Sequence, residues 1–291
     1  MTRLKRVLIT GANSYVGTNV EKWLMREPEK YYVETLDMKD PNWINFDFSG
    51  FDVVFHVAGI AHVTNKKSND DLYYKINRDL AVQTAHIAKN AGVKQFIFMS
   101  SMIIFGEDND IYNKSHIDIS KYNPINAYGK SKLEADLAIQ KLRDGQFAVS
   151  VVRTPIIYGP QCKGNFPRLE KIALLLFVVP KIHNQRSMIY IDNFSEFIKC
   201  IIDDAASDTF YPQNSRYAST SEIIHLIRKY KKKKTIFTKL LNFPLKFLSK
   251  YMRFIRKVFG NKTYDFSISN QYGFDYNIVN YEETIYQSIT K

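Results

Sequence analysis

Tyr128 and Lys132 are two residues whose types and spacing suit proton transfer. Four residues apart on a helix, they share one face. A phenol with a pKa near ~10 exchanges protons poorly at neutral pH, and positive charge from Lys132 would favour the phenolate. A pair of serines, Ser100 and Ser101, ends an apolar run upstream. Such a Tyr-x-x-x-Lys pair is also common as a packed aromatic beside a snorkelling lysine, so its meaning depends on the surrounding motifs.

A glycine-containing segment, TGANSYVG at 10–17, follows the first apolar run and opens a helical pattern. Backbone N–H groups at such a helix N-terminus can hold a pyrophosphate. Gly11 suits the tight turn and Gly17 allows close packing of helix on strand, but Ser14 stands where the middle glycine is usual. Taken alone, the segment could also be an ordinary strand-to-helix turn.

Asp37 ends the second apolar run, 20 to 26 residues after the glycines. A carboxylate there would accept hydrogen bonds from an adenosine ribose diol and repel a 2′-phosphate. Lys39 follows and could neutralise such a phosphate, so both NAD(H) and NADP(H) remain open as cofactors. An exposed turn aspartate is the alternative interpretation of Asp37.

The elements that must position these residues alternate along the first half of the chain. Helical patterns at 73–91 and 127–142 separate strand-like apolar runs at 6–12, 31–37, 51–59, 94–101 and 147–153. Alternation of strands with helices predicts a parallel sheet, and continuous apolar strands predict helices on both faces. We therefore expect an α/β, doubly wound, Rossmann-type sheet.

The alternation stops after Gly159. We expect residues 1–160 to form the dinucleotide-binding core, with parts of 186–206 returning to it. Residues 161–291 should then form mainly a smaller substrate domain that closes over the carboxyl ends of the strands.

The order of the motifs resembles the extended short-chain dehydrogenase/reductase family over roughly the first 200 residues. They are TGANSYVG, DVVFHVAG, KIN at 75–77, FIFMSSMIIFG, YGKSK and RTPIIYGP. The resemblance implies that Tyr128 is the acid/base and that Lys132 binds the nicotinamide ribose and lowers the tyrosine pKa. Ser101, four residues before Phe105, would hydrogen-bond the reacting oxygen.

The same resemblance implies the binding residues. Those for NAD(H) or NADP(H) are Gly11, Asn13, Ser14, Tyr15, Val16, Gly17, Asp37, Asp47, Phe48, Ala58, Asn77, Tyr128, Lys132 and Pro155. Those for a UDP-linked sugar are Ser101, Tyr128, Asn165, Arg168, Arg186 and His62. Arg186 would bind the nucleotide diphosphate as a bidentate fork; a surface arginine and, for His62, a solvated loop histidine are the alternatives.

Met102 and Ile103 follow Ser101, where family dehydratases carry an acidic pair, so a 4,6-dehydratase is disfavoured. The motifs GNFPRL and NQRS and the basic C-terminal third resemble the capsule and O-antigen subgroup, which reduces UDP-4-keto-6-deoxy-N-acetylhexosamines. The implied product is UDP-N-acetylquinovosamine or UDP-N-acetylfucosamine. A UDP-hexose 4-epimerase and a catalytically inactive NAD(P)-binding regulator are the alternatives.

The net charge of +12 is concentrated late in the chain. Residues 223–264 hold 13 Lys or Arg and no Asp or Glu. A helix over 244–259 would gather Leu245, Leu248, Met252, Ile255 and Phe259 near one face. That face could lie on an anionic membrane or pack on the substrate domain. Nucleic-acid binding is disfavoured, because no recognition motif accompanies the charge.

The remaining features indicate a cytoplasmic enzyme, with membrane association through the basic segment left open. Cys162 and Cys200 match no metal-ligand spacing, so we expect a reducing compartment and no metal. The N-terminus lacks the long apolar region of a signal peptide, and no apolar run is long enough to span a bilayer. The helices at 73–91 and 127–142 could pair across a twofold axis in a homodimer.

Overall fold

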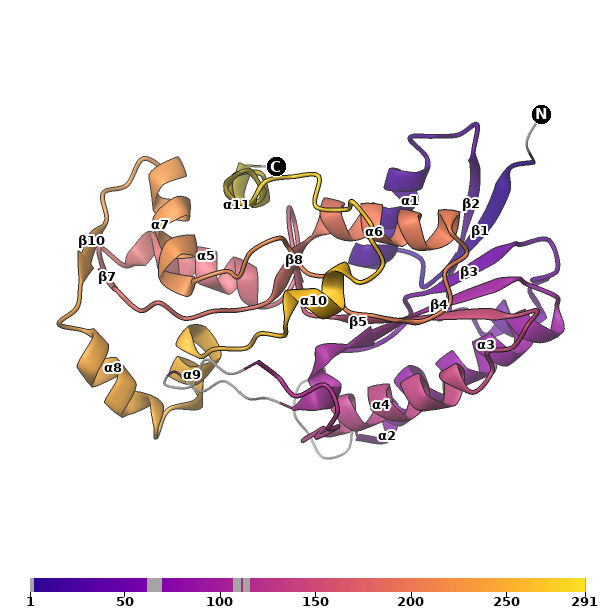
Figure 1. Cartoon of the computed structure of the whole chain (residues 1–291), viewed down its shortest axis with the longest axis horizontal. Helices are drawn as coiled ribbons and strands as arrows, with labels where there is room; N and C mark the ends of the chain where they lie inside the picture. Colours follow the sequence, from indigo (N-terminus) through magenta and orange to yellow (C-terminus); the bar gives the residue numbers. More distant parts are fainter. Residues whose placement is uncertain (1–2, 62–69, 107–110, 112–115, 291) are drawn as a thin grey trace.

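The computed structural model describes residues 3–61, 70–106, 111 and 116–290. Its centre is a parallel six-stranded sheet in the order β2-β1-β3-β4-β5-β9 (Figure 1). The strands are β1 (Lys5–Thr10), β2 (Tyr31–Leu36), β3 (Val53–His56), β4 (Gln95–Ser101), β5 (Ala148–Thr154) and β9 (Thr209–Phe210). Five of them lie in the predicted apolar runs. The doubly wound parallel sheet is thereby confirmed.

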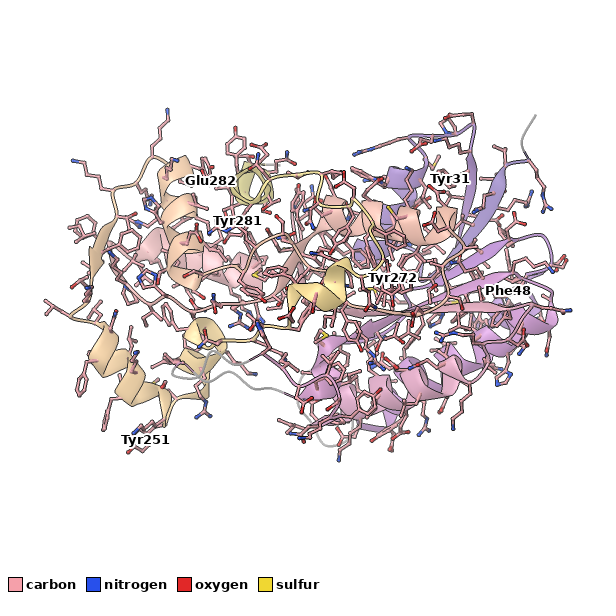
Figure 2. All side chains as sticks on the ribbon, viewed as in Figure 1. Tyr31, Phe48, Tyr251, Tyr272, Tyr281 and Glu282 are labelled. Atoms are coloured by element: carbon pink, nitrogen blue, oxygen red, sulfur yellow. The ribbon has the colours of Figure 1, made fainter. Side chains whose placement is uncertain are left out.

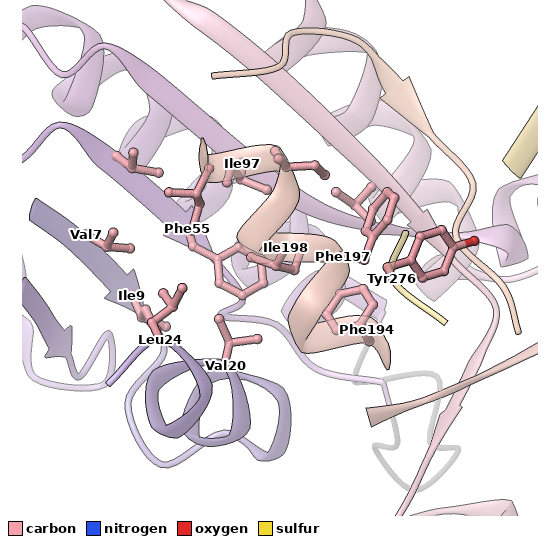
Figure 3. Packing of buried hydrophobic residues seen from close by; sticks show 14 of the residues in the cluster. Val7, Ile9, Val20, Leu24, Phe55, Ile97, Phe194, Phe197, Ile198 and Tyr276 are labelled. Carbon is pink, nitrogen blue, oxygen red and sulfur yellow. The ribbon is translucent and has the colours of Figure 1, made fainter. Parts of the chain in front are cut away.

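Helices cover both faces of the sheet (Figure 1). On one face α1 (Tyr15–Leu24) and α6 (Ile191–Asp203) pack on Val7 and Ile9, and Figure 3 shows Phe194, Phe197 and Ile198 of α6 in this layer. On the other face α3 (Ala81–Asn90) and α4 (Ala127–Gln140) pack on Leu8. Successive side chains of a strand point to opposite faces, which is why the consecutive residues Val7, Leu8 and Ile9 of β1 are all apolar and buried.

The helix predicted over 73–91 differs from the structure at its start. It begins as α2 (Asp70–Tyr73), continues as a π-helical stretch, η3 (Tyr74–Leu80), and then becomes α3. π-Helical turns are rare and occur frequently at functional sites. Here the stretch contains Asn77, whose side chain is fully buried.

The later part of the chain has its own apolar core. Its helices are α5 (Asn165–Leu175), α7 (Thr220–Tyr230), α10 (Phe266–Asn270) and α11 (Tyr281–Thr290), and its strands form the pairs β6 (Ile156–Tyr158) with β8 (Met188–Tyr190) and β7 (Val178–Pro180) with β10 (Ile236–Thr238). Two short 3₁₀ helices, η1 (Pro41–Asn45) and η4 (Met102–Phe105), lie in the first half of the chain. The buried side chains of this core come mainly from α5, α7 and α11.

The single helix predicted over 244–259 is wrong. Two short helices, α8 (Asn242–Ser249) and α9 (Arg253–Phe259), replace it, because Met252 has an extended backbone at φ −111°, ψ 100°. Ile255 and Phe259 are buried, whereas Leu248 and Met252, predicted for the same face, are exposed. Among the described residues no helix is long and apolar enough to cross a membrane.

Candidate active site

The carboxyl ends of β1 and β3 meet at the point where the winding of the sheet reverses. β1 lies between β2 and β3. The chain first adds β2 on one side of β1 and then crosses to add β3, β4 and β5 on the other side. Ligands of open α/β sheets bind in the crevice at such a point. The backbone N–H groups of Val57 and Ala58 both donate to the carbonyl oxygen of Thr10, at 3.0 and 2.9 Å, which closes the floor of this crevice.

Gly11 makes the turn out of β1. Its φ of +113° lies in the region that favours glycine, and a Cβ there would lie 2.8 Å from the backbone nitrogen of Ala58. The N–H groups of Gly11 and Ala12 donate to the carbonyl oxygen of Leu36, at 2.9 and 3.1 Å. The turn is therefore fixed between the ends of β2 and β3, and no larger residue fits it.

Ser14, the departure from the usual glycine pattern, is the N-cap of α1. Its hydroxyl accepts the N–H of Gly17 at 3.1 Å, and a Cβ on Gly17 would lie 2.6 Å from that oxygen. Asn13 before it has a left-handed φ of +61°. Tyr15 and Val16 open the helix, so their N–H groups have no acceptor within it and can bind an anion.

Three of the residues predicted to bind the cofactor lie between β2 and β3. Asp37 is exposed directly after β2, and its carboxylate accepts the N–H of Lys39 at 3.0 Å. Asp47 is also exposed, and hydrogen bonds from Ser49 lower the pKa of its carboxyl group. Phe48 is buried in the core, so only its backbone could meet a cofactor.

Asn77 holds the loop that follows β3. Its side-chain oxygen accepts the N–H of Ile60 at 2.9 Å, and its amide donates to the carbonyl oxygen of Ile60 at 3.0 Å. A Cβ on Gly59 would lie 3.0 Å from the side-chain oxygen of Asn77 and 3.3 Å from Nζ of Lys132. The loop containing the buried Ala58 is therefore packed against Lys132.

Ser101, Tyr128 and Lys132 come together at the end of β4. Ser101 is the last residue of that strand, and Tyr128 lies in the first turn of α4, which the side chain of Asn126 caps. The hydroxyl of Ser101 lies near enough to the phenol of Tyr128 to lower its pKa, and it accepts the N–H of Ile103 at 3.3 Å. Nζ of Lys132, one turn further on, donates to the carbonyl oxygen of Met99 at 2.9 Å.

Burial dominates the electrostatics of this group. It lowers the pKa of Lys132 to about 8. It raises the pKa of Tyr128 above its ordinary value, and the hydrogen bond from Ser101 offsets this only in part. Burial also lowers the pKa of His56 in β3 to about 3, so His56 is neutral. The predicted lowering of the Tyr128 pKa by Lys132 and oxidised nicotinamide stays a prediction.

Sequence reasoning missed a buried ionic network behind the site. The hydroxyl of Ser100 donates to the carboxylate of Asp136 at 2.5 Å, and Arg153 donates to the same carboxylate at 2.8 and 3.0 Å. Arg153 also donates to the phenol oxygens of Tyr211 and Tyr122, at 2.6 and 2.9 Å. An arginine inside the apolar run of β5 was the available signal, since a buried guanidinium needs a carboxylate partner.

Arg186, predicted to bind the diphosphate, is half-buried in the later part of the chain. Its backbone pairs with that of Ala218 through two hydrogen bonds of 2.9 Å. Its Nη1 donates to the carbonyl oxygen of Lys257 in α9 at 2.5 Å. Burial lowers the pKa of Arg186 to about 10, which leaves the guanidinium charged at neutral pH.

Lys262, which sequence reasoning also missed, ties this part of the chain to the end of β4. Its Nζ donates to the carbonyl oxygen of Gly106 at 2.8 Å. Nearby, the N–H of Ile117 donates to the carbonyl oxygen of Thr263 at 2.7 Å. Residues 257–263 therefore run from Arg186 to Gly106, which follows the turn η4 after β4.

The other predicted residues are placed as follows. Pro155 follows β5, directly after Thr154, which is the register partner of Ser101. Asn165 and Arg168 are exposed in the first turn of α5. His62 lies outside the described residues.

The chain is similar to proteins that are named as 4-epimerases of diphosphate-linked sugars. A UDP-glucose 4-epimerase of Vibrio cholerae is 29% identical over 243 residues, covering 76% of this chain and 74% of that enzyme. An N-acetyl-alpha-D-glucosaminyl-diphospho-ditrans,octacis-undecaprenol 4-epimerase of Escherichia coli O157:H7 is 28% identical over 218 residues, covering 69% of this chain and 64% of that enzyme.

Solved structures share the fold over nearly the whole chain. A UDP-glucuronic acid 4-epimerase from Bacillus cereus, 18% identical, superposes with a TM-score of 0.73 over 97% of each chain. A dTDP-4-dehydrorhamnose reductase from Bacillus anthracis in complex with NADP, 20% identical, gives 0.70 over 98% of this chain and 99% of that one. At these identities the likeness concerns the fold.

The glycine turn that no larger residue fits, the helix N-terminus beyond it and the carboxylate after β2 are together suited to a dinucleotide. Residues 7–211 match the model of one protein family, a range that includes this turn, the strand ends and the group at Tyr128. The chain therefore belongs to the NAD dependent epimerase/dehydratase family, and a nicotinamide dinucleotide is its cofactor.

Proposed function

We propose that this protein reduces the C4 ketone of a UDP-4-keto-6-deoxy-N-acetylhexosamine with NAD(P)H, for surface polysaccharide synthesis. The product would be UDP-N-acetylquinovosamine or UDP-N-acetylfucosamine. The observation that carries the proposal is that Ser101, Tyr128 and Lys132 come together at the end of β4, with Lys132 packed against the loop after β3. Met102 is buried and Ile103 half-buried directly after Ser101, so this turn offers no acidic pair for elimination.

In the proposed reaction the bound cofactor supplies the hydride that reaches C4 and is itself oxidised. Tyr128 gives its proton to the C4 oxygen, so that ketone, hydride and proton together make the alcohol. Ser101 donates a hydrogen bond to the same oxygen as negative charge develops on it. Lys132 is largely protonated at neutral pH, with a pKa of about 8, and can donate to the ribose of the cofactor.

We propose the remaining roles from placement. Residues 1–160 would hold the cofactor, and residues 161–291 would mainly hold the sugar nucleotide. The guanidinium of Arg186 is charged and is held by the carbonyl oxygen of Lys257, and we propose that it binds the diphosphate of the substrate. Asn165 and Arg168 would contact the substrate from α5.

A UDP-hexose 4-epimerase is the second candidate. The similarity to the 4-epimerases of Vibrio cholerae and Escherichia coli favours it. Both reactions need one acid/base and one cofactor at C4, but an epimerase oxidises and re-reduces the same carbon, so it shows no net consumption of reduced cofactor.

The deciding experiment follows absorbance of NADH and NADPH with UDP-4-keto-6-deoxy-N-acetylglucosamine, and separately tests conversion of UDP-glucose to UDP-galactose. We expect stoichiometric cofactor oxidation that Tyr128→Phe abolishes and Tyr74→Phe, a half-buried tyrosine of η3, retains. Conversion of UDP-glucose without net oxidation would instead establish the epimerase. A folded wild type that does neither would exclude both.

We also propose a homodimer formed by the helices at 73–90 and 127–140. Its support is an open hollow between the outer faces of η3, α3 and α4, together with the exposed apolar side chains of Leu72 in α2 and Leu137 in α4. The residues that line the hollow are Arg78, Asp79, Val82, Gln83, His86 and Ala138.

A further inference from the structure

The far end of the later part of the chain carries apolar side chains in solvent. We define the distal surface as the exposed residues of 175–181 and 232–257. Figure 1 shows β7, β10 and α8 at the end of the molecule farthest from β1 and β2, and Figure 2 shows Tyr251 at its outer edge. Among the described residues, 13 of the 23 exposed large apolar side chains lie between Leu175 and Phe254. Single exposed apolar residues are ordinary, but such a concentration marks an interaction site.

α8 shows why this surface lacks a partner within the chain. Its inner side packs through Leu245 and the buried Ser249. The opposite side of α8 carries Phe243 and Phe247, which are 80 and 52% exposed, and Leu240 and Tyr251, which flank the helix, are 86 and 73% exposed. A helix that is apolar on both sides is normally covered on both, so α8 lacks one of its neighbours.

The strand pair beside α8 extends the surface. β7 and β10 lie next to each other, and Phe177, Ile236 and Phe237 on or beside these strands are exposed. Leu175, at the end of α5, is 84% exposed. The apolar area therefore spans a helix and a sheet edge.

The charge around this area has one sign. Exposed lysines lie among the apolar residues, and neither 171–191 nor 223–264 contains an Asp or Glu. The exposed lysines are Lys181, Lys232, Lys233, Lys234, Lys239, Lys250 and Lys257. Aromatic and aliphatic side chains mixed with lysines are typical of segments that lie in the interface of an anionic membrane.

We propose that the distal surface docks on a phospholipid bilayer with anionic headgroups. Phe243, Phe247 and Tyr251 enter the interfacial layer, while the lysines contact headgroup phosphates. A second copy of the chain is a poorer occupant, because a twofold pairing of this surface would set lysines against lysines without a carboxylate. This proposal does not depend on which sugar nucleotide the enzyme reduces.

Docking at this surface would also help to fix the position of Arg186, the arginine that we propose binds the substrate diphosphate. The carbonyl oxygen of Lys257, in the last turn of α9, accepts from Arg186, and Lys262 reaches Gly106 beyond the catalytic strand. The segment that meets the membrane is therefore continuous with the segment that positions Arg186. The active site would face a substrate supply or a product acceptor close to the bilayer.

The test is flotation of the full-length protein with vesicles of phosphatidylcholine alone or mixed with phosphatidylglycerol. We expect binding only to the mixed vesicles, weakened by salt. A variant with Leu240→Ser, Phe243→Ser, Phe247→Ser and Tyr251→Ser, and a second with Lys239→Glu and Lys250→Glu, should each bind at least ~10-fold more weakly. All six side chains are exposed, so the fold should persist.

The matched control changes exposed apolar residues elsewhere: Leu4→Ser, Met25→Ser, Ile44→Ser and Ile278→Ser. It should bind vesicles as the wild type does. Wild type that does not float with the mixed vesicles, or a control that loses binding equally, would overturn the proposal. So would a distal variant whose sedimentation shows loss of a dimer, because the occupant would then be a second copy. Cofactor oxidation with a water-soluble substrate should be the same in all variants, which separates this result from the proposed reaction.

Discussion

Lys132 is a buried cation whose charge costs folding free energy. Burial lowers its pKa from 10.5 to about 8. Between these two pH values the unfolded chain holds a proton that the folded chain has lost, so this group makes the protein more stable as pH rises from 8 to 10.5. Below pH 8 both states are protonated, and the full cost of burying the charge remains.

Lys132→Met should therefore abolish catalysis yet raise the free energy of unfolding at pH 7 by roughly 1–3 kcal/mol. The gain should shrink as pH rises above 8, because the wild type then loses the charge in the folded state. Urea unfolding at several pH values measures both. Lys130→Met, at an exposed position of the same helix, should change neither stability nor its pH dependence. A destabilised Lys132→Met at pH 7 would contradict the argument.

The Asp136–Arg153 pair behind the site should act in the opposite way. Both side chains are buried, so Asp136→Asn leaves a guanidinium without its counter-charge and should lower the free energy of unfolding by about 3–5 kcal/mol. Glu134 lies on the same helix as Asp136 and forms an exposed pair with Arg78 of η3. Glu134→Gln breaks that pair and should cost less than about 1 kcal/mol. Urea unfolding of the two variants checks this, and equal small losses would show that the buried pair contributes little.

Which residues could be predicted from the sequence depends on how local their signal is. Ser101, Tyr128 and Lys132 lie in short motifs with fixed spacing, and the structure brings them together, although their roles stay predictions. Asp136 and Lys262 carry no such motif. Asp136 meets Arg153 across 17 residues, and Lys262 meets Gly106 across 156, so only the folded chain shows these partners.

At the scale of elements, the turn from β1 to α1 depends on both the conformation and the space at Gly11. Gly11→Ala adds backbone strain of about 1–2 kcal/mol. It also puts a Cβ 2.8 Å from the backbone of Ala58, in the crevice where the cofactor pyrophosphate is expected. We expect NADH affinity, measured by fluorescence titration, to fall at least ~10-fold.

Gly92→Ala is the matched control for that turn. Gly92 also has a positive φ, +81°, but no described atom lies within 4 Å of a Cβ there. Gly92→Ala should lose a similar amount of stability through strain while keeping NADH affinity. Loss of affinity in both variants would mean that general destabilisation, and not the contact with Ala58, explains the effect.

Hydrophobic periodicity predicted the strands of the sheet but not the interruptions of its helices. The strands β1 to β5 contain continuous apolar runs because helices cover both faces of the sheet. Such a run predicts a strand without requiring the sequence to show which residues face which side. The break between α8 and α9 falls at residues 250–252, which include no glycine or proline. It is set by where Ile255 and Phe259 find a buried position, which is a tertiary effect.

On the scale of the whole molecule, two surfaces of different character lie far apart in the fold. The distal surface is cationic and apolar, whereas the face of α3 and α4 mixes charged and apolar side chains. Arg78 there is paired with Asp79 and Glu134, so a twofold contact of this face need not oppose like charges. The proposed dimer and the proposed membrane contact can therefore exist together.

The dimer leads to the last prediction. In sedimentation velocity the wild type should have twice the mass of the chain, and Leu137→Glu should shift it to the monomer. Leu137 is exposed in the single chain, so a carboxylate there is harmless until a dimer buries it without a partner; the dissociation constant should rise roughly 10- to 100-fold. Met25→Glu, at an exposed apolar position in another part of the chain, should leave the mass unchanged. A wild type that sediments as a monomer would show that α3 and α4 do not pair, and the site at Tyr128 would then be complete within one chain.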